Sequence, residues 1–422
     1  MLLEYYLIAT FSIFLSPGRT PILGPSITKR TKAMLKKLLT GAFCALVAGS
    51  SLAATDPMEI SIAYVGQQID LGPVLSNIIP EPKDSGLQGA RLAIADSNTT
   101  GRFLKQHYNL HEIAGDDPQQ LVASAFDLYG RGIRFFVANT DSDTLKSLRA
   151  SLPADSLLIN AGSRDDALRS NQCIDGLLHT IPSRAMLADA LAQWLIMRRW
   201  NRWMLVEGST DDDQAFAAAI KRSAQRFGGK IVAEKAWSFD TDLRRTAQKE
   251  LPPFTSGTEY DVVVVADERG DFGEYLPYNT GLPRPVVGTQ GLLPTGWHKM
   301  IEAWGAAQLQ SRFEKQSERW MNEKDYASWA AIRSIAEAVT RTGDNSSEGV
   351  RGYLLSDNFE LAAFKGRKLN FRGWSGQLRQ PIALIHPRAL VSSSPQEGFL
   401  HPRTELDTLG FDEPESQCRV AR

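Results

Sequence analysis

The sequence predicts an α/β protein built from two doubly wound, Rossmann-like lobes, each containing a parallel sheet. The chain has 422 residues, a length that suggests two lobes of roughly 100–200 residues each. Short apolar runs alternate with helical patterns, and this alternation begins again near Ser183. The run Val262–Ala266 is apolar throughout, as in strands covered on both faces of a sheet.

The first alternation predicts four strands separated by helices. The helix Gly86–Asn98 has apolar residues near helical spacing. Another helix begins at Asp117, with an acid at the N-cap and proline at the next position, and ends near Gly130. A third helix begins around Ser142. The predicted strands are the run containing Ile60, Ile62, Tyr64 and Val65, then Tyr108–Ala114, Ile133–Ala138 and Ser156–Asn160. A βαβ alternation requires a parallel sheet with right-handed crossovers.

The second alternation begins with a helix that Ser183 can cap. Long helices are predicted over 308–342 and, more briefly, over Val350–Leu355. A hairpin then joins Leu369–Phe371 to Gln377–Ile385, and the tail beyond Pro387 has no clear period. The remaining predicted elements are strands Trp203–Val206, Ile231–Ala236, Val262–Ala266 and Pro285–Gly288, and helices Asp211–Phe227 and Asp242–Leu251.

Charge and the N-terminus indicate an exported, soluble protein. The 47 basic and 48 acidic residues give a net charge of −1, which argues against a nucleic-acid partner because phosphate binding usually needs a basic excess. Basic residues near Met34, an apolar run to Ala48 and a small-residue site ending at Ala53 form a secretory signal pattern. Residues 1–33 are interpreted as an upstream extension, so that residues 1–53 precede the mature chain. A buried N-terminal helix is the alternative.

Two cysteines, Cys173 and Cys418, would remain after cleavage. In an oxidising compartment an even pair can form a disulfide, which here would tie the C-terminal tail to the body. Two unpaired buried thiols are an equally acceptable interpretation. The sequence has no Cys/His cluster with zinc spacing.

Several ordered segments resemble the type I periplasmic binding proteins of the leucine/isoleucine/valine-binding class, which serve ATP-driven (ABC) importers. The similar segments are Gln88–Asp96, Ala114–Pro118, Leu178–Ser183 and Trp329–Ala338. The tail from Ser394 to Gly410 is similar to a subgroup associated with pyrroloquinoline-quinone (PQQ)-dependent alcohol dehydrogenase systems.

The resemblance implies lobes that are discontinuous in sequence, because in that family three strands form the hinge between them. The crossovers are expected near Thr180, Gly288–Leu293 and Ser356. The implied lobes are 57–179 plus 297–355, and 180–293 plus 356–385, followed by a C-terminal extension over 386–422. The implied function is that of a periplasmic solute receptor, a monomer that binds a small-molecule ligand and docks on permease subunits of the inner membrane.

Candidate ligand-binding residues follow the strands, because ligands of open parallel sheets gather beyond the strands' carboxyl ends. Loops after the third and fourth strands contain Thr140 with Ser142, and Ala161 with Ser163. The resemblance implies that hydroxyl and backbone N–H groups of these two loops hold a ligand carboxylate. The alternative is that Ser142 is only a helix N-cap and Ser163 a turn residue. Further candidates in the loop after the first strand are Gln67, Gln68 and Asp70.

The second lobe departs from the amino-acid-binding pattern because its loops are acidic. Glu207, Asp211 and Asp267 follow predicted strands and could hold a cationic group of the ligand or a hard cation. Alternatively, Asp211 and its acidic neighbours only complement the dipole of a helix. These departures put the usual amino-acid ligand in doubt.

Motifs for catalysis or cofactor binding are absent from the sequence, which contains no GxSxG, GxxxxGK[ST], GxGxxG or HExxH pattern. We therefore expect no catalytic residues, metal or cofactor. The alternative functions are a ligand sensor or scaffold of a signalling or redox system without transport and, last, a hydrolase on the same fold.

Overall fold

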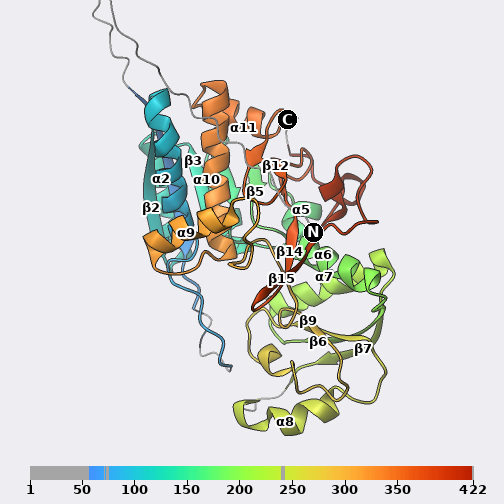
Figure 1. Ribbon diagram of the computed structural model, residues 1–422. Helices are drawn as coiled ribbons and strands as arrows, with labels where there is room; N and C mark the ends of the chain where they lie inside the picture. The colour runs from blue at the N-terminus through green and yellow to red at the C-terminus, as the bar shows by residue number, and fades with distance from the viewer. Residues whose placement is uncertain (1–56, 71, 73–75, 239–242, 421–422) are drawn as a thin grey trace, which may run out of the picture. The chain divides into compact units, whose positions relative to one another are not determined.

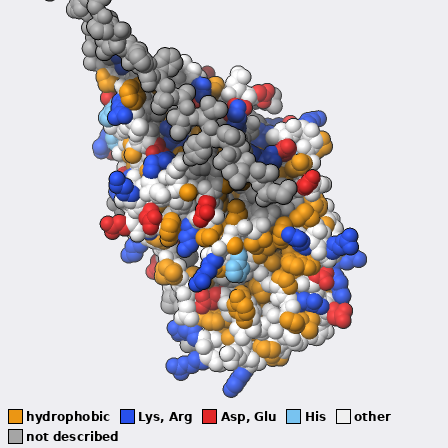
Figure 2. Space-filling model, in the orientation of Figure 1, with side chains coloured by type: hydrophobic (Ala, Val, Ile, Leu, Met, Phe, Trp, Pro, Cys, Tyr) orange, Lys and Arg blue, Asp and Glu red, His pale blue; other side chains and the backbone are white. Residues whose placement is uncertain are grey.

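The computed structural model describes residues 57–70, 72, 76–238 and 243–420. The predicted signal peptide and upstream extension lie outside these residues. In the part of the chain that is described, no helix has the length and apolar character needed to cross a bilayer. On the face seen in Figure 2, acidic and basic side chains are interspersed among neutral and hydrophobic ones.

The first lobe is built on a five-stranded parallel sheet of order β2-β1-β3-β4-β5. The four predicted strands are confirmed, and β5 is an additional strand that the sequence did not predict. The strands are β1 (Met58–Gln67), β2 (Gln106–Gly115), β3 (Phe135–Asn139), β4 (Leu157–Asn160) and β5 (Leu177–His179).

Helices cover both faces of this first sheet. Along β1, Ile60, Ile62 and Tyr64 pack into one hydrophobic cluster, and Ala63 and Val65 pack into another, as the period-2 alternation of a strand requires. The second cluster includes residues of α3 (Pro118–Gly130) and α4 (Ser142–Ser151). In the first cluster, α2 (Leu87–Leu104) packs alongside α10 (Glu323–Thr342), a helix from much later in the chain (Figure 1).

The second lobe repeats this arrangement on a four-stranded parallel sheet of order β7-β6-β8-β9. Its strands are β6 (Arg202–Glu207), β7 (Lys230–Ala236), β8 (Val262–Ala266) and β9 (Val286–Gly288). Helices α6 (Arg184–Met197) and α7 (Asp211–Phe227) pack on one face, and α8 (Leu243–Phe254) packs on the other. As predicted, Ser183 caps α6.

The long helix predicted over 308–342 is two helices, α9 (Ala306–Ser317) and α10 (Glu323–Thr342). The first ends at Glu318, which has a left-handed backbone with φ 58°, and the second begins with a reciprocal cap between Asn322 and Asp325. A short helix, α11 (Ser347–Leu354), follows. All three helices contribute to the core of the first lobe.

Two small antiparallel sheets replace the single predicted hairpin. Its first part is confirmed, since β12 (Lys368–Phe371) pairs with β13 (Leu378–Arg379). The second strand then ends, and Ile382–His386 forms a separate strand, β14, between β10 (Leu293–Thr295) and β15 (Ala389–Ser394). The remaining small strand, β11 (Leu361–Ala362), pairs with β12.

The boundaries implied for the late part of the chain need correction. Residues Phe359, Leu361 and Leu369 lie in the core of the first lobe, although segment 356–385 was assigned to the second. The side chains of strand β14 then alternate between the two cores. Ile382 and Leu384 lie in the core of the second lobe, and Ala383 and Ile385 lie in the core of the first. The described part of segment 386–422 packs on the body, since β15 pairs with β14 and Leu409 is buried in the core of the second lobe.

Polar side chains join the segments that connect the lobes. The Gln380 side chain donates to the carbonyl of Thr180 (2.7 Å), between β5 and α6. Buried Lys365 donates to the Gln380 amide oxygen, and burial lowers the pKa of Lys365 to about 7. These contacts tie the segment after β13 to the segment after β5.

Candidate functional site

Two serine hydroxyls meet at the carboxyl edge of the first sheet. Ser142 follows β3 and Ser163 follows β4, and their Oγ atoms are 2.7 Å apart. Ser163 is buried, and Ser142 is half-buried at the first position of α4. The first N–H groups of a helix have no acceptor within it, and the serine pair lies beside these N–H groups of α4. The structure thus brings together the two residues that the resemblance singled out.

Asp141, rather than Ser142, caps helix α4, so the capping alternative for Ser142 is wrong. One carboxylate oxygen of Asp141 accepts from the backbone N–H of Thr144 (2.7 Å). The other accepts from the Gln67 side chain (2.7 Å), whose amide oxygen accepts from the Asp141 N–H (2.9 Å). Gln67, a predicted ligand residue, therefore positions the loop after β3, and the Ser142 hydroxyl is not used for capping.

The turn that carries Ser163 is organised by Asn160, at the end of β4. Its side-chain oxygen accepts from the N–H groups of Gly162 (3.1 Å) and Ser163 (2.9 Å), and its nitrogen donates to the Ser163 carbonyl (2.7 Å). A side chain at Gly162 would collide with Asn139 and with the backbone of Thr140. The absence of a side chain at this position therefore lets the two serine-bearing loops approach each other.

The other candidates of the first lobe lie beneath or beside the serine pair. Thr140 and Ala161 are buried, and the Thr140 hydroxyl donates to the carbonyl of Asp141 (3.2 Å). Gln68 and Asp70 are exposed. The Asp70 carboxylate accepts from the N–H of Gly72 (2.9 Å), which is a local turn contact.

In the second lobe, the predicted acidic residues differ in what surrounds them. Asp267 is buried, and its carboxylate accepts four backbone N–H groups, from Gly270, Asp271, Phe272 and Gly273, at 2.6–3.0 Å. It therefore shapes the loop after β8. Half-buried Glu207 pairs with Lys221 (3.4 Å). Asp211 is exposed in the first turn of α7, as the helix-dipole alternative requires.

Two ion pairs near these loops were not predicted. Arg184, at the start of α6, donates two bonds to Glu268 (2.7 and 2.9 Å) and a third to Asp212 (2.5 Å). Although burial opposes it, hydrogen bonding to Glu268 and its charge raise the pKa of Arg184 above its ordinary value. In the first lobe, Arg164 pairs with Glu323. The pairs meet where the Arg184 N–H donates to the Arg164 carbonyl (3.1 Å).

A buried histidine lies near the serine turn. His179 is buried, and its Nδ1 lies 3.0 Å from the Asn160 side-chain nitrogen. Burial, and then the nearby charge of Arg169, hold the pKa of His179 well below its usual value. Within the described residues, no group of three or more His, Cys, Asp or Glu side chains is arranged to hold a metal ion.

Comparisons with known proteins agree with this architecture. Residues 81–249 match the family model described as "Periplasmic binding protein". No curated protein matches the chain. Among solved structures, a branched-chain amino acid ABC transporter ligand-binding protein from Burkholderia xenovorans is similar with a TM-score of 0.66. The two share 15% identity over 86% of this chain and 99% of that one.

Two further solved structures show the same fold. A leucine-, isoleucine-, valine-, threonine- and alanine-binding protein from Brucella ovis has a TM-score of 0.65 at 12% identity, covering 87% of this chain and 100% of that one. A branched-chain amino acid transporter substrate-binding protein from Streptococcus pneumoniae, in complex with isoleucine, has a TM-score of 0.59 at 14% identity. It covers 80% of this chain and 99% of that one. The fold class predicted from the sequence is confirmed, and the matched family model covers residues 81–249.

Proposed function

We propose that the chain is a periplasmic solute receptor. The premise is that it has the fold of the type I periplasmic binding proteins and matches the family model over residues 81–249. It binds a small polar metabolite beyond the carboxyl edges of its two sheets and delivers it to an ABC-type permease. The observation that carries this proposal is the meeting of Ser142 and Ser163 across two loops.

The serine pair suits a ligand oxygen. Each hydroxyl can donate or accept, and without a ligand the two satisfy each other at 2.7 Å. A carboxylate oxygen beside the pair could accept a bond from both hydroxyls. Because Asp141 already places a negative charge at the start of α4, we assign recognition to the hydroxyls rather than to the helix dipole.

The second lobe would supply groups of opposite character. Exposed Asp211, in the first turn of α7, is an acidic side chain that can meet a cationic or hydroxyl part of the ligand. One of the similar structures is a complex with isoleucine and another is a complex with leucine. They support amino acids as the first ligands to test. Ligand contacts made to both lobes at once would favour the closed conformation by population shift.

Binding can be tested on the serine pair directly. Native mass spectrometry of protein purified without denaturation would identify a co-purified small molecule, and calorimetry would measure its affinity. We expect the double variant Ser142→Ala/Ser163→Ala to lose about 1–3 kcal/mol of binding free energy, the cost of buried hydrogen bonds left unmade. The control is Ser147→Ala, because Ser147 lies exposed on the same helix and bonds only to its own helix's carbonyl at Asp143. Unchanged affinity in the double variant would place the site elsewhere.

Delivery to a permease is the second step of the proposal. Cells lacking the gene should lose uptake of the identified ligand, whereas a sensor or scaffold without transport would leave uptake intact and change a response to the ligand. The tail's similarity to the PQQ-associated subgroup extends the proposal to a link with PQQ-dependent alcohol oxidation. The uptake assay should therefore be made in cells growing on alcohols as well as on sugars.

A further inference from the structure

The C-terminal tail, defined here as residues 405–420, contacts both lobes. It contains two short 3-10 turns, η2 (Glu405–Thr408) and η3 (Glu413–Glu415). At its start, the Asp407 carboxylate accepts from Arg372 (2.9 Å) and Arg379 (2.8 Å). Buried Arg372 also donates to the carbonyls of Leu406, Leu409 and Phe411. The beginning of the tail is thereby fixed to the β12–β13 hairpin, because Arg372 follows β12 and Arg379 ends β13.

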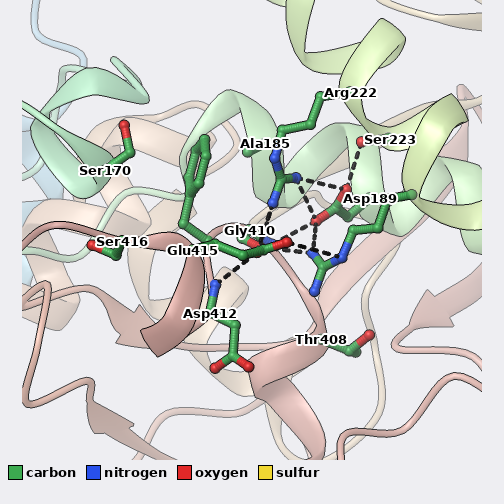
Figure 3. A network of polar contacts seen from close by, with 12 residues as sticks. Ser170, Ala185, Asp189, Arg222, Ser223, Thr408, Gly410, Asp412, Glu415 and Ser416 are labelled. Atoms are coloured by element: carbon green, nitrogen blue, oxygen red, sulfur yellow. Dashed lines mark hydrogen bonds and ion pairs between the residues drawn. The ribbon is translucent and has the colours of Figure 1, made fainter.

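The middle of the tail is anchored to the second lobe through Asp189 (Figure 3). This fully buried carboxylate on α6 accepts from the Gly410 N–H (2.8 Å), from Ser223 (2.5 Å) and from Arg226 (2.7 Å). Arg226 also donates to the Gly410 carbonyl (2.8 Å), and Arg222 pairs with Glu415 (2.9 Å). Charge-assisted bonds to a buried carboxylate are among the stronger contacts in proteins, so this anchor holds the tail firmly against α6 and α7.

The end of the tail is anchored to the first lobe. The Ser416 hydroxyl donates to the Arg169 carbonyl (2.9 Å), and the Gln417 N–H donates to the Ser170 carbonyl (2.6 Å). Cys418 is buried and joined to Cys173 by a disulfide, with the two Cα atoms 5.3 Å apart. The neighbouring Leu168 lies in a core cluster of the first lobe.

The tail passes from the second lobe to the first between two consecutive residues. Glu415 is paired with an arginine of the second lobe, and Ser416, the next residue, is bonded to the first. Consecutive Cα atoms are 3.8 Å apart, so the lobes cannot separate at this point unless one anchor detaches. The second-lobe anchor consists of hydrogen bonds and ion pairs, whereas the first-lobe anchor includes a covalent bond.

We propose that the C-terminal tail is a disulfide-anchored strap that restrains movement between the two lobes. The Cys173–Cys418 bond keeps the tail on the first lobe, and the Asp189–Arg222–Arg226 cluster keeps it on the second. Loss of either anchor widens the range of lobe arrangements available to the protein. The strap belongs to the connection between lobes and not to the ligand loops, so its test does not depend on the proposed function.

The test measures ligand-free protein with and without the disulfide. Dithiothreitol reduces the folded protein in place, since the disulfide takes up two electrons and two protons to become two thiols while the reagent closes to a cyclic disulfide. We expect the radius of gyration from small-angle X-ray scattering to rise on reduction. Amide exchange at Gln417 should accelerate at least tenfold. The Cys173→Ser/Cys418→Ser variant should show both changes without reagent and no further change when the reagent is added.

A second variant tests the other anchor with the disulfide intact. Glu415→Gln removes the ion pair to Arg222 and should raise the radius of gyration in the same direction by a smaller amount. The proposal fails if thiol titration shows complete reduction while scattering stays unchanged, even if exchange at Gln417 accelerates, because the tail would then be only a local attachment. It also fails if oxidised protein shows two free thiols.

Discussion

The carboxyl edges of the two sheets use different chemistry. At the first edge, the neutral hydroxyls of Ser142 and Ser163 lie 2.7 Å apart, beside the Asp141 carboxylate that caps α4. At the second edge, acidic groups already have strong partners, since Asp267 accepts four backbone N–H groups and Glu268 is held by Arg184. The number of acidic residues in a loop therefore does not predict how many carboxylates are available to a ligand, because some are already bonded within the protein.

The largest effect on stability is expected for a substitution of Asp267. In Asp267→Asn, one oxygen remains for four N–H groups, and the new amide adds donors where only acceptors fit. We expect the free energy of unfolding to fall by about 2–4 kcal/mol, because buried donors left without a partner cost about 1–3 kcal/mol each. Urea unfolding followed by tryptophan fluorescence measures the change.

The matched control for Asp267 is Asp211→Asn on the exposed first turn of α7. There the loss is limited to a weak interaction with the helix dipole, about 0.3–1 kcal/mol. If both variants were destabilised equally, the distinction between a structural and an available acid in the second lobe would be wrong.

A second test removes the cation that neutralises Glu268. Arg184→Gln leaves that carboxylate without its two-bond partner, and we expect a loss of about 1.5–3 kcal/mol of stability, the usual contribution of hydrogen bonds to charged groups. Arg184→Lys should recover part of the loss, because an ammonium keeps the charge without the planar fork. Equal unfolding free energies for the Lys and Gln variants would show that the charge alone, without the two-bond geometry of Arg184, contributes nothing there.

Local patterns predicted much of the fold, because each such element depends on residues close in sequence. The uniform apolar run of β8 and the Asp117 cap of α3 are examples. Strand β5 was missed because its three residues are too few to show a period. The break between α9 and α10 was missed because left-handed Glu318 replaces the glycine or proline that usually marks such an end.

The candidate site was less predictable because its partners are distant in sequence. The serine loops followed from strand ends, and the structure adds their contact across 21 residues. Arg184 and Glu268 are 84 residues apart, and Arg164 and Glu323 are 159 apart. No spacing rule connects residues over such distances. The four N–H groups that occupy Asp267 belong to the backbone, so side-chain identities could not reveal them.

The smallest expected effect concerns Lys221, which pairs with Glu207 and Glu234 at the more exposed side of the second edge. Burial opposes it, but hydrogen bonding to Glu234 and the charge of Glu207 raise the pKa of Lys221 above its ordinary 10.5. The stabilisation is therefore complete below the ordinary lysine pKa and is lost as the pH rises through the higher folded value. Lys221→Met should lower stability at pH 7 by about 0–1 kcal/mol, as for other exposed pairs, and the difference should shrink in 1 M salt. A larger, salt-independent loss in urea unfolding would show that the pair is buried as firmly as Arg184 and Glu268, and the second edge would then be rigid throughout.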